Sequence, residues 1–295
     1  MESGRTHVGD VEIAYDLFGD RGKPLVLIMG IGAQRVFWDD ALCLQFRDAG
    51  FRVVRFDHRD IGESSRVDAP VPDPRKLLAR RLVGAPITAP YTLSDMAGDV
   101  AGLIEHLGFG AAHIVGVSLG GMVAQHLAIE RPERVRSLTS IMSSPGGRRY
   151  LPKPSALRAL FAPAPRTAIE AGLHAERVFT ILGSTAWPVD AERLREIGSL
   201  AYARGMSPRG FLRHFAAVLA SGDRKARLRD VKAPTLVIHG SRDPMFPLRA
   251  GRDLVRMVPD ATWLPIAGMG HDLPRPLWPV LVAAIARHAE RAEAR

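Results

Sequence analysis

Residues 113–122 read His-Ile-Val-Gly-Val-Ser-Leu-Gly-Gly-Met, and this stretch decides the fold class of the 295-residue chain. It contains a G-x-S-x-G pattern in which Ser118 lies between Gly116 and Gly120. An apolar run with the character of a buried strand precedes the pattern, and the sequence from Leu119 onward has helical character. A reactive serine needs a sharp strand-to-helix turn, and small residues two positions away let that strained turn close. The stretch therefore predicts a strand, a nucleophilic serine and a helix, in that order.

Strand-like and helix-like segments alternate on both sides of this stretch. The apolar runs that predict strands are residues 25–29, 52–56, 113–117, 135–142, 235–239 and 262–266. The segments with helical spacing are residues 36–48, 93–107, 122–130, 248–257 and a final helix from Leu277. Such alternation is typical of a mainly parallel β-sheet flanked by helices. We therefore predict a fold of the α/β class.

The alternation is interrupted between the fourth predicted strand (135–142) and the fifth (235–239), because no strand is predicted between them. Four helical stretches broken by Pro and Gly lie there, at residues 156–160, 167–181, 190–204 and 209–219. A helical block inserted between two strands of one sheet is typical of a cap. We therefore divide the chain into a first core part (1–143), a helical cap insertion (144–230) and a second core part (231–295).

A second insertion, residues 66–90, is rich in Pro and contains a basic helical piece at residues 75–81. Three interpretations stay open for it. It is a solvated surface helix, a flap at the entrance of a site, or a helix that touches a membrane.

Composition narrows the function classes. The net charge is +9, but the cations are scattered and no nucleic-acid-binding motif is present, so no nucleic-acid partner is expected. The first 20 residues contain no apolar stretch of signal-peptide length, and no run of 18 apolar residues predicts a membrane span. The single cysteine, Cys43, is interpreted as a small core residue. We expect a cytoplasmic protein, since one cysteine fits a reducing compartment.

A serine hydroxyl needs a base and an orienting acid before it is an effective nucleophile. Asp243 follows the predicted strand at 235–239, and His271 follows the one at 262–266. Catalytic groups in open α/β sheets gather at the carboxyl ends of the strands. Ser118, Asp243 and His271 are therefore predicted to meet, with His271 as the base and Asp243 as its partner.

Other acids and histidines fit these roles less well. Asp260 precedes its strand, which places it at the opposite edge of the sheet, and Asp272 adjoins His271 and is badly placed to reach its Nδ1. His113 and His239 lie within predicted strands and are interpreted as core residues. His58 belongs to an Asp-His-Arg-Asp turn, which we interpret as structural.

The loop after the first predicted strand reads Met29-Gly30-Ile31-Gly32 and is the candidate oxyanion loop. The backbone N–H groups of Ile31 and Leu119 are the predicted oxyanion donors. The two glycines also resemble the start of a dinucleotide fingerprint, but Arg35 occupies the third glycine position. No paired Cys/His spacing and no P-loop is present, so neither a cofactor nor a metal is expected.

Taken together, these motifs resemble the α/β-hydrolase superfamily over nearly the whole chain, and bacterial esterases of the aclacinomycin methylesterase type more closely. The segments that carry the resemblance are residues 27–30, 56–62, 116–120, 235–244 and 268–271. Many superfamily members have His-Gly before the oxyanion residue. This chain has Met29-Gly30 at that place, and in this it resembles the methylesterase-like subgroup. The resemblance implies the α/β-hydrolase fold and a cofactor-free hydrolase with a helical cap over the serine.

We therefore expect a serine carboxylic-ester hydrolase that acts through an acyl-enzyme on a small, largely apolar ester. Six residues are candidates for lining the pocket, although an apolar side chain in such a position is more often a core residue. They are Trp38, Met122, Phe179, Trp187, Phe211 and Met269. A C–C bond hydrolase and a cofactor-free perhydrolase would use the same three residues, and a non-catalytic ligand-binding homologue is a third alternative. Enzymes with an Asp nucleophile are disfavoured by Ser118. The natural ester, its acyl and alcohol parts, and the oligomeric state, for which a homodimer is one option, stay open.

Overall fold

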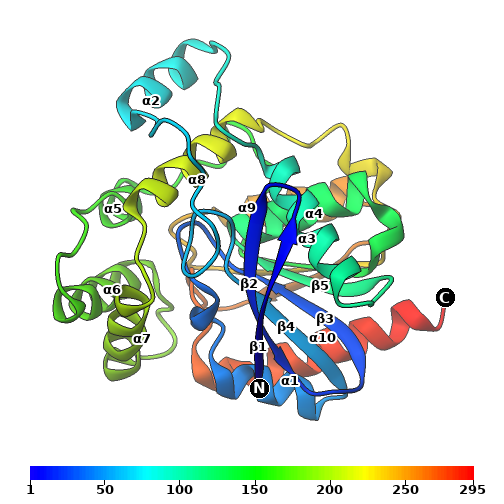
Figure 1. Cartoon of the computed structure of the whole chain (residues 1–295). Coiled ribbons are helices and arrows are strands. Elements are labelled where there is room, and N and C mark those ends of the chain that lie inside the picture. The colour runs from blue at the N-terminus through cyan, green and yellow to red at the C-terminus, as the bar shows by residue number, and fades with distance from the viewer.

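The computed structural model, which describes residues 1–295, is built around one eight-stranded sheet (Figure 1). The strands lie side by side in the order β1-β2-β4-β3-β5-β6-β7-β8. Their bounds are β1 Glu2–Val8, β2 Val11–Phe18, β3 Lys23–Ile28, β4 Phe51–Phe56, β5 Ala112–Val117, β6 Val135–Ile141, β7 Thr235–Gly240 and β8 Thr262–Ile266. Every pairing from β4 to β8 is parallel, whereas β1 and β2 pair antiparallel with their neighbours. The predicted α/β class and the six predicted strands are confirmed.

The N-terminal hairpin of β1 and β2 was not predicted. Gly9 turns the chain between the two strands with a φ of +56°, which a glycine adopts without steric cost. β1 is an edge strand in which only Thr6 is buried, so it has almost no apolar alternation. Strand β1 therefore left little hydrophobic signal in the sequence, whereas β2 was not predicted although six of its eight residues are buried.

Helices cover both faces of the sheet. The α-helices are α1 Asp40–Asp48, α2 Pro74–Val83, α3 Leu93–His106, α4 Leu119–Glu130, α5 Pro154–Leu160, α6 Ala168–Leu182, α7 Ala191–Ala203, α8 Pro208–Ala220, α9 Leu248–Met257 and α10 Trp278–Glu293. Single 3₁₀ turns are η1 Arg35–Phe37, η2 Pro132–Arg134, η3 Leu228–Asp230 and η4 Arg275–Leu277. The apolar faces of α3, α4 and α9 form one core with one side of the sheet. Those of α1 and α10 form a second core on the other side, which includes the fully buried Cys43.

The predicted helix at 36–48 is divided in two. After the turn η1, Trp38 has an extended backbone, and the Asp39 side chain accepts a hydrogen bond from Ala41 N as the N-cap of α1. This capping bond satisfies a backbone donor that a continuous helix would have paired internally. The helix therefore begins at Asp40 rather than at Val36.

Helices α5 to α8 fill the segment between β6 and β7 and lie together on one side of the sheet (Figure 1). Helices α6 and α7 pack closely against each other. Helix α2 belongs to the other insertion and projects from the molecule beyond α8 in Figure 1. Its Leu77 packs against Phe215 of α8. No helix of the chain has the length and apolar content that a transmembrane segment requires.

Candidate active site

Ser118 lies at the turn from β5 into α4 and has an unusual backbone conformation. Its φ and ψ are 54° and −119°, in a region that non-glycine residues rarely occupy. The turn is held by the end of the neighbouring strand β6 and by the loop that follows it. Ser118 N donates to Ile141 O over 3.0 Å, and Ser143 Oγ donates to Ser118 O over 2.7 Å. The strained turn is therefore fixed by its surroundings, and its conformation is the one that the G-x-S-x-G pattern predicts.

The two glycines of the pattern allow backbones to approach closely. A Cβ at Gly116 would lie 2.3 Å from Gly120 O, and a Cβ at Gly120 would lie 2.2 Å from Ile28 O. The start of α4 therefore packs directly against the ends of β5 and β3, which no larger residue permits.

Replacing Gly120 by alanine is expected to lower the free energy of unfolding by about 2–3 kcal/mol, because the new methyl group collides with backbone rather than with a flexible side chain. Gly98 on α3 is the matched control, since a Cβ there meets nothing within 4 Å. Gly98→Ala is expected to raise the free energy of unfolding by about 0.5–1 kcal/mol through helix propensity. Urea unfolding of both variants measures the difference, and equal effects would contradict the packing argument.

Ser118, His271 and Asp243 form a continuous hydrogen-bonded chain. The Ser118 hydroxyl donates to His271 Nε2 over 3.0 Å, and His271 Nδ1 donates to Asp243 Oδ2 over 2.9 Å. Asp243 follows β7 and His271 follows β8, so the parallel sheet brings residues from distant parts of the chain to one edge. Ser118 and Asp243 are buried. The structure thus brings together the three residues that the sequence singled out.

The second oxygen of Asp243 is fixed by its own loop. Asp243 Oδ1 accepts hydrogen bonds from Met245 N over 2.7 Å and Phe246 N over 2.9 Å. His239, on β7, is completely buried, and its Nε2 donates to Phe246 O over 3.0 Å. Burial lowers the pKa of His239, which keeps the ring neutral. Asp243 is therefore oriented toward His271, and His239 has a core position.

The competing acids lie elsewhere. Asp260 is exposed in the turn before β8 and pairs with Arg295 at 3.8 Å. Asp272 accepts a hydrogen bond from Ser184 Oγ over 2.5 Å instead of one from the imidazole. Burial raises the pKa of Asp272. Neither carboxylate replaces Asp243 at His271 Nδ1.

The end of α6 supports the loop that carries His271. His271 N donates to Leu182 O over 2.7 Å, and Gly270 N donates to Ser184 Oγ over 3.0 Å. A Cβ at Gly270 would lie 2.2 Å from Gly183 O, so the two loops are in close backbone contact. The position of the imidazole therefore depends on the inserted helices as well as on β8.

The candidate oxyanion loop lies next to Ser118. A Cβ at Gly30 would lie 3.4 Å from the Cβ of Ser118. The N–H of Ile31 is bonded to no backbone or side-chain acceptor. Leu119 is the first residue of α4, so its N–H has no acceptor within the helix. The two N–H groups that the sequence proposed as oxyanion donors are thus free to bind a ligand.

Two buried histidines hold this loop, and sequence reasoning missed their joint role. His58 Nε2 donates to Met29 O over 3.0 Å, and Gly32 N donates to His214 Nδ1 over 3.3 Å. His214 Nε2 donates to Arg59 O over 3.0 Å, which fixes Nδ1 as the acceptor. Burial lowers the pKa of His58 to about 3 and that of His214 to about 4, so both rings are neutral. The turn residue His58 is structural, and its partner His214 comes from α8.

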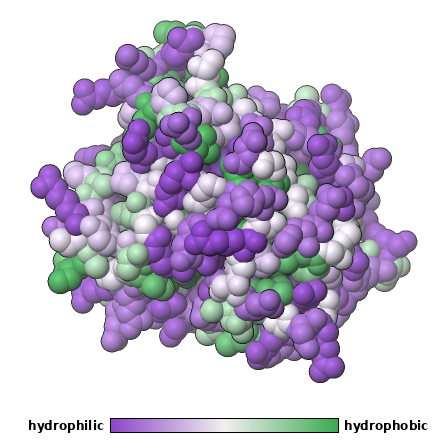
Figure 2. Space-filling model, in the orientation of Figure 1, coloured by the Kyte–Doolittle hydropathy of each residue, from purple (hydrophilic) through white to green (hydrophobic).

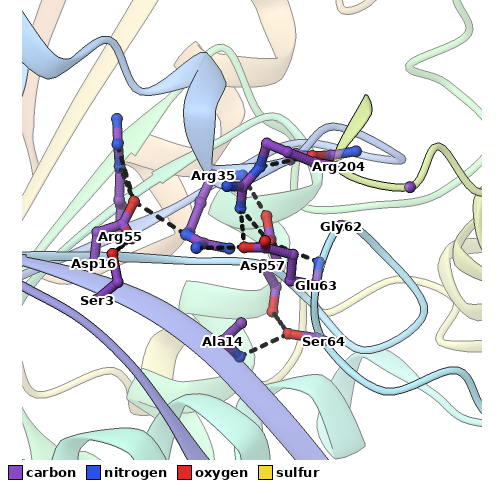
Figure 3. A network of polar contacts seen from close by, with 12 residues as sticks. Ser3, Ala14, Asp16, Arg35, Arg55, Asp57, Gly62, Glu63, Ser64 and Arg204 are labelled. Atoms are coloured by element: carbon purple, nitrogen blue, oxygen red, sulfur yellow. Dashed lines mark hydrogen bonds and ion pairs between the residues drawn. The ribbon is translucent and has the colours of Figure 1, made fainter. Parts of the chain in front are cut away.

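A buried network of ions lies just after the candidate oxyanion loop (Figure 3). Arg35 contacts Asp57, Asp16 Oδ2 at 3.0 Å and Glu63 Oε2 at 2.7 Å. Arg204, at the C-terminal end of α7, reaches the same Glu63 at 2.6 Å. Because these charges are paired, their burial is tolerated. Arg35, which occupies the third glycine position of a dinucleotide fingerprint, therefore ties the candidate oxyanion loop to the sheet and, through Glu63, to Arg204 of α7.

The structure distributes the six candidate pocket residues over several environments. Trp38 and Met269 are buried in the core beneath α1 and α10, and half-buried Trp187 packs against that core. Met122 is buried in the opposite core, one turn after Ser118. Phe179 stacks on Phe37 with ring centroids 6.0 Å apart. Of the six, Phe211 of α8 lies beside the candidate oxyanion loop, because a Cβ at Gly32 would lie 2.7 Å from its ring.

Comparisons with known proteins find similarity to hydrolases at the level of family, sequence and structure. The family model described as alpha/beta hydrolase fold matches residues 23–274. Rhodomycin D methylesterase DnrP of Streptomyces peucetius is 28% identical over 292 residues, which cover 91% of each chain. The enol-lactonase of Burkholderia xenovorans LB400 has a TM-score of 0.72 at 20% identity, covering 97% of this chain and 100% of its own. The 2-hydroxy-6-oxo-6-phenylhexa-2,4-dienoate hydrolase of Rhodococcus sp. strain RHA1 has a TM-score of 0.76 at 20% identity, covering 98% of both chains.

Proposed function

The chain belongs to the alpha/beta hydrolase fold family and is a hydrolase, and from this premise we propose that it cleaves small carboxylic esters through a serine acyl-enzyme. The observation that carries the proposal is the hydrogen-bonded chain from Ser118 Oγ through His271 to Asp243. This arrangement of nucleophile, base and orienting acid suits acyl transfer. The name of the relative from Streptomyces peucetius, a methylesterase, supports an ester as the substrate class.

The proposed reaction has two halves. His271 Nε2 takes the proton of Ser118 while Oγ attacks the ester carbonyl, and Asp243 holds the imidazole in the required tautomer. The N–H groups of Ile31 and Leu119 bind the oxyanion. His271 then gives its proton to the departing alcohol, which leaves the acyl group on Ser118. In the second half, water attacks the carbonyl of the acyl group while His271 takes its proton. The acid is released and Ser118 recovers its proton from His271.

In this proposal residues 144–230 form the cap, and residues 1–143 and 231–295 form the core. The hydrogen bond from His271 N to Leu182 O supports a cap that adjoins the catalytic base. A largely apolar ester is supported by three aromatic rings near the oxyanion loop. Phe161 lies 5.5 Å from Phe211 and 4.9 Å from Phe215, measured between ring centroids.

Two measurements test the function. A fluorophosphonate probe is expected to label the folded protein at Ser118, since it reacts with an activated serine. A panel of methyl and p-nitrophenyl esters, a dienoate ring-cleavage product and a peroxide-dependent halogenation assay is then compared. We expect kcat/KM for the best ester to exceed that for the dienoate by at least about tenfold, which corresponds to about 1.4 kcal/mol. Absence of labelling would contradict the mechanism, and a preference for the dienoate or for perhydrolysis would contradict the reaction class.

His214 is expected to act as a positioning residue for the oxyanion loop. His214→Gln keeps an amide near the Nε2 position but removes the acceptor for Gly32 N–H, whereas His214→Asn places its carbonyl oxygen near Nδ1. Since losing an entire oxyanion donor costs about 10²–10³ in kcat, misplacing the loop is expected to cost roughly tenfold in the Gln variant. The Asn variant should stay within about threefold of wild type.

The two variants are compared by kcat and KM with a short p-nitrophenyl ester and by thermal unfolding. The expected loss is in kcat, with KM and the unfolding temperature similar for both variants. Equal kcat losses in His214→Gln and His214→Asn would assign His214 to packing alone.

A further inference from the structure

Helix α2 adjoins a second segment, residues 148–158, on the surface of the molecule. Arg148 comes from the stretch after β6, and its Nη2 donates to Leu82 O over 2.7 Å and also contacts Arg81 O. These carbonyls belong to the last turn of α2, where a cation is favourable. We call α2 and residues 148–158 together the α2 surface.

The α2 surface is strongly basic. Its eight cations, out of 40 Lys and Arg in the chain, are Arg75, Lys76, Arg80, Arg81, Arg148, Arg149, Lys153 and Arg158. Neither segment contains an Asp or Glu. None of the eight cations forms an ion pair, although many other arginines of the protein do. The surface therefore presents uncompensated positive charge to the solvent.

The same surface exposes large apolar side chains. Five of the twelve exposed large hydrophobic residues of the chain lie on it, namely Leu78, Leu82, Val83, Leu151 and Leu157. Leu82 and Val83 are 79% and 80% exposed. Figure 2 shows hydrophobic and hydrophilic side chains together on the projection that α2 forms in Figure 1. Exposure of several large apolar side chains to water is unfavourable. A group of them surrounded by cations therefore indicates an interaction surface.

The helix is anchored so that these side chains face outward. Asp73 caps its first turn by accepting a hydrogen bond from Arg75 N. Leu77 is buried against Phe215, while Leu78 and Leu82, four residues apart, share an exposed face. The basic and apolar surface is therefore already formed in the folded protein, and binding does not require α2 to fold.

We propose that the α2 surface binds the face of an anionic lipid membrane. Anionic headgroups complement the eight cations, and the leucines enter the boundary with the acyl chains, as in interfacial amphipathic helices. With ten residues, α2 is about 15 Å long and lies on the bilayer rather than crossing it. Nucleic acid fits less well, because phosphates do not use exposed leucines and the α2 surface offers only the buried Tyr150 as an aromatic ring for stacking.

Docking would bring the candidate active site close to the bilayer. Leu77 and Phe215 belong to one apolar cluster, and Ile31 of the oxyanion loop packs against it. Membrane binding itself does not depend on the proposed esterase function. Ser118→Ala is therefore expected to bind vesicles as the wild type does, so that failure of one proposal is distinguishable from failure of the other.

The contribution of the cations to membrane binding is measured by co-sedimentation of the protein with vesicles. Vesicles of phosphatidylcholine with about 30 mol% phosphatidylglycerol are compared with pure phosphatidylcholine at about 0.1 M salt. The double variant Arg75→Gln/Lys76→Gln removes two exposed side chains that make no hydrogen bond or ion pair. Each cation near an anionic surface raises the partition coefficient about fivefold. The double variant is therefore expected to lower the partition coefficient roughly 30-fold. The matched control is Arg287→Gln/Arg291→Gln on exposed positions of α10, with an expected change below about twofold.

The apolar contribution is tested with Leu82→Ser, which is expected to lower the partition coefficient about fivefold. Val280→Ser on α10 removes an exposed apolar side chain at a distant site and is expected to change binding less than about twofold. Absence of wild-type binding to the anionic vesicles, or equal losses in the α2 and α10 variants, would overturn the proposal. Binding to duplex DNA that Arg75→Gln/Lys76→Gln weakens, while vesicle binding stays unchanged, would assign the surface to nucleic acid instead.

Discussion

Replacement of Ser118 by alanine is expected to lower kcat/KM for short p-nitrophenyl esters by about 10⁵-fold or more while the protein stays folded. The variant loses the attacking oxygen, and the imidazole of His271 has no other side-chain hydroxyl within hydrogen-bonding distance. Binding and the oxyanion donors would remain, so a residual rate above that in water is expected. Initial rates at high enzyme concentration, together with the unfolding midpoint in urea, measure both parts of the prediction.

Ser140 provides a matched control for this variant. It lies on β6 beside β5, is completely buried, and its Oγ has no hydrogen-bond partner. Ser140→Ala therefore removes a buried hydroxyl close to the site without removing a bond, and activity is expected within about twofold of wild type. If Ser118→Ala kept more than about 1% of wild-type turnover, Ser118 would not be the nucleophile.

The strands that could be predicted from the sequence are those with a clear run of apolar residues. β3 to β7 are mostly buried strands, whereas β8 is largely exposed or half-buried, and the predicted boundaries of all six lie within two residues of the observed ones. The convergence of Ser118, Asp243 and His271 was predictable because each follows a parallel strand, and the topology alone brings such positions to one edge. Edge strand β1 has no comparable pattern, since water covers most of its residues.

Contacts from the inserted helices could not be predicted from the sequence. His214 bonds to Gly32 across 182 residues, and Arg204 reaches Glu63 across 141 residues. Nothing in the local sequence of α7 or α8 distinguishes these side chains from the many other polar residues of the chain. The packing of the inserted helices on the sheet decides which residues they contact, so the support of the candidate oxyanion loop became visible only in the structure.

Replacement of Asp243 by asparagine is expected to lower kcat by about 10⁴-fold. Asp243 Oδ1 accepts two backbone hydrogen bonds, from Met245 and Phe246, and an asparagine must place its carbonyl oxygen there to keep them. Its NH₂ group then faces Nδ1 of His271 and forces that nitrogen to be an acceptor. The proton moves to Nε2, where it prevents the imidazole from taking the hydroxyl proton of Ser118. The loss therefore follows from the wrong tautomer and not from a disrupted fold.

Asp272→Asn is the matched control, because it makes the same chemical change in the residue next to His271. Asp272 accepts from Ser184 Oγ and does not touch the imidazole, so the neutral amide can keep an acceptor oxygen at that position. Activity is expected within about tenfold of wild type, since only the support of the loop changes. Pre-steady-state release of p-nitrophenol from both variants separates the acylation rate from substrate binding. If the two variants lost activity equally, or if Asp272→Asn lost more, the role of the orienting acid would pass from Asp243 to Asp272, and the hydrogen bond seen at Nδ1 would not be the one that catalysis uses.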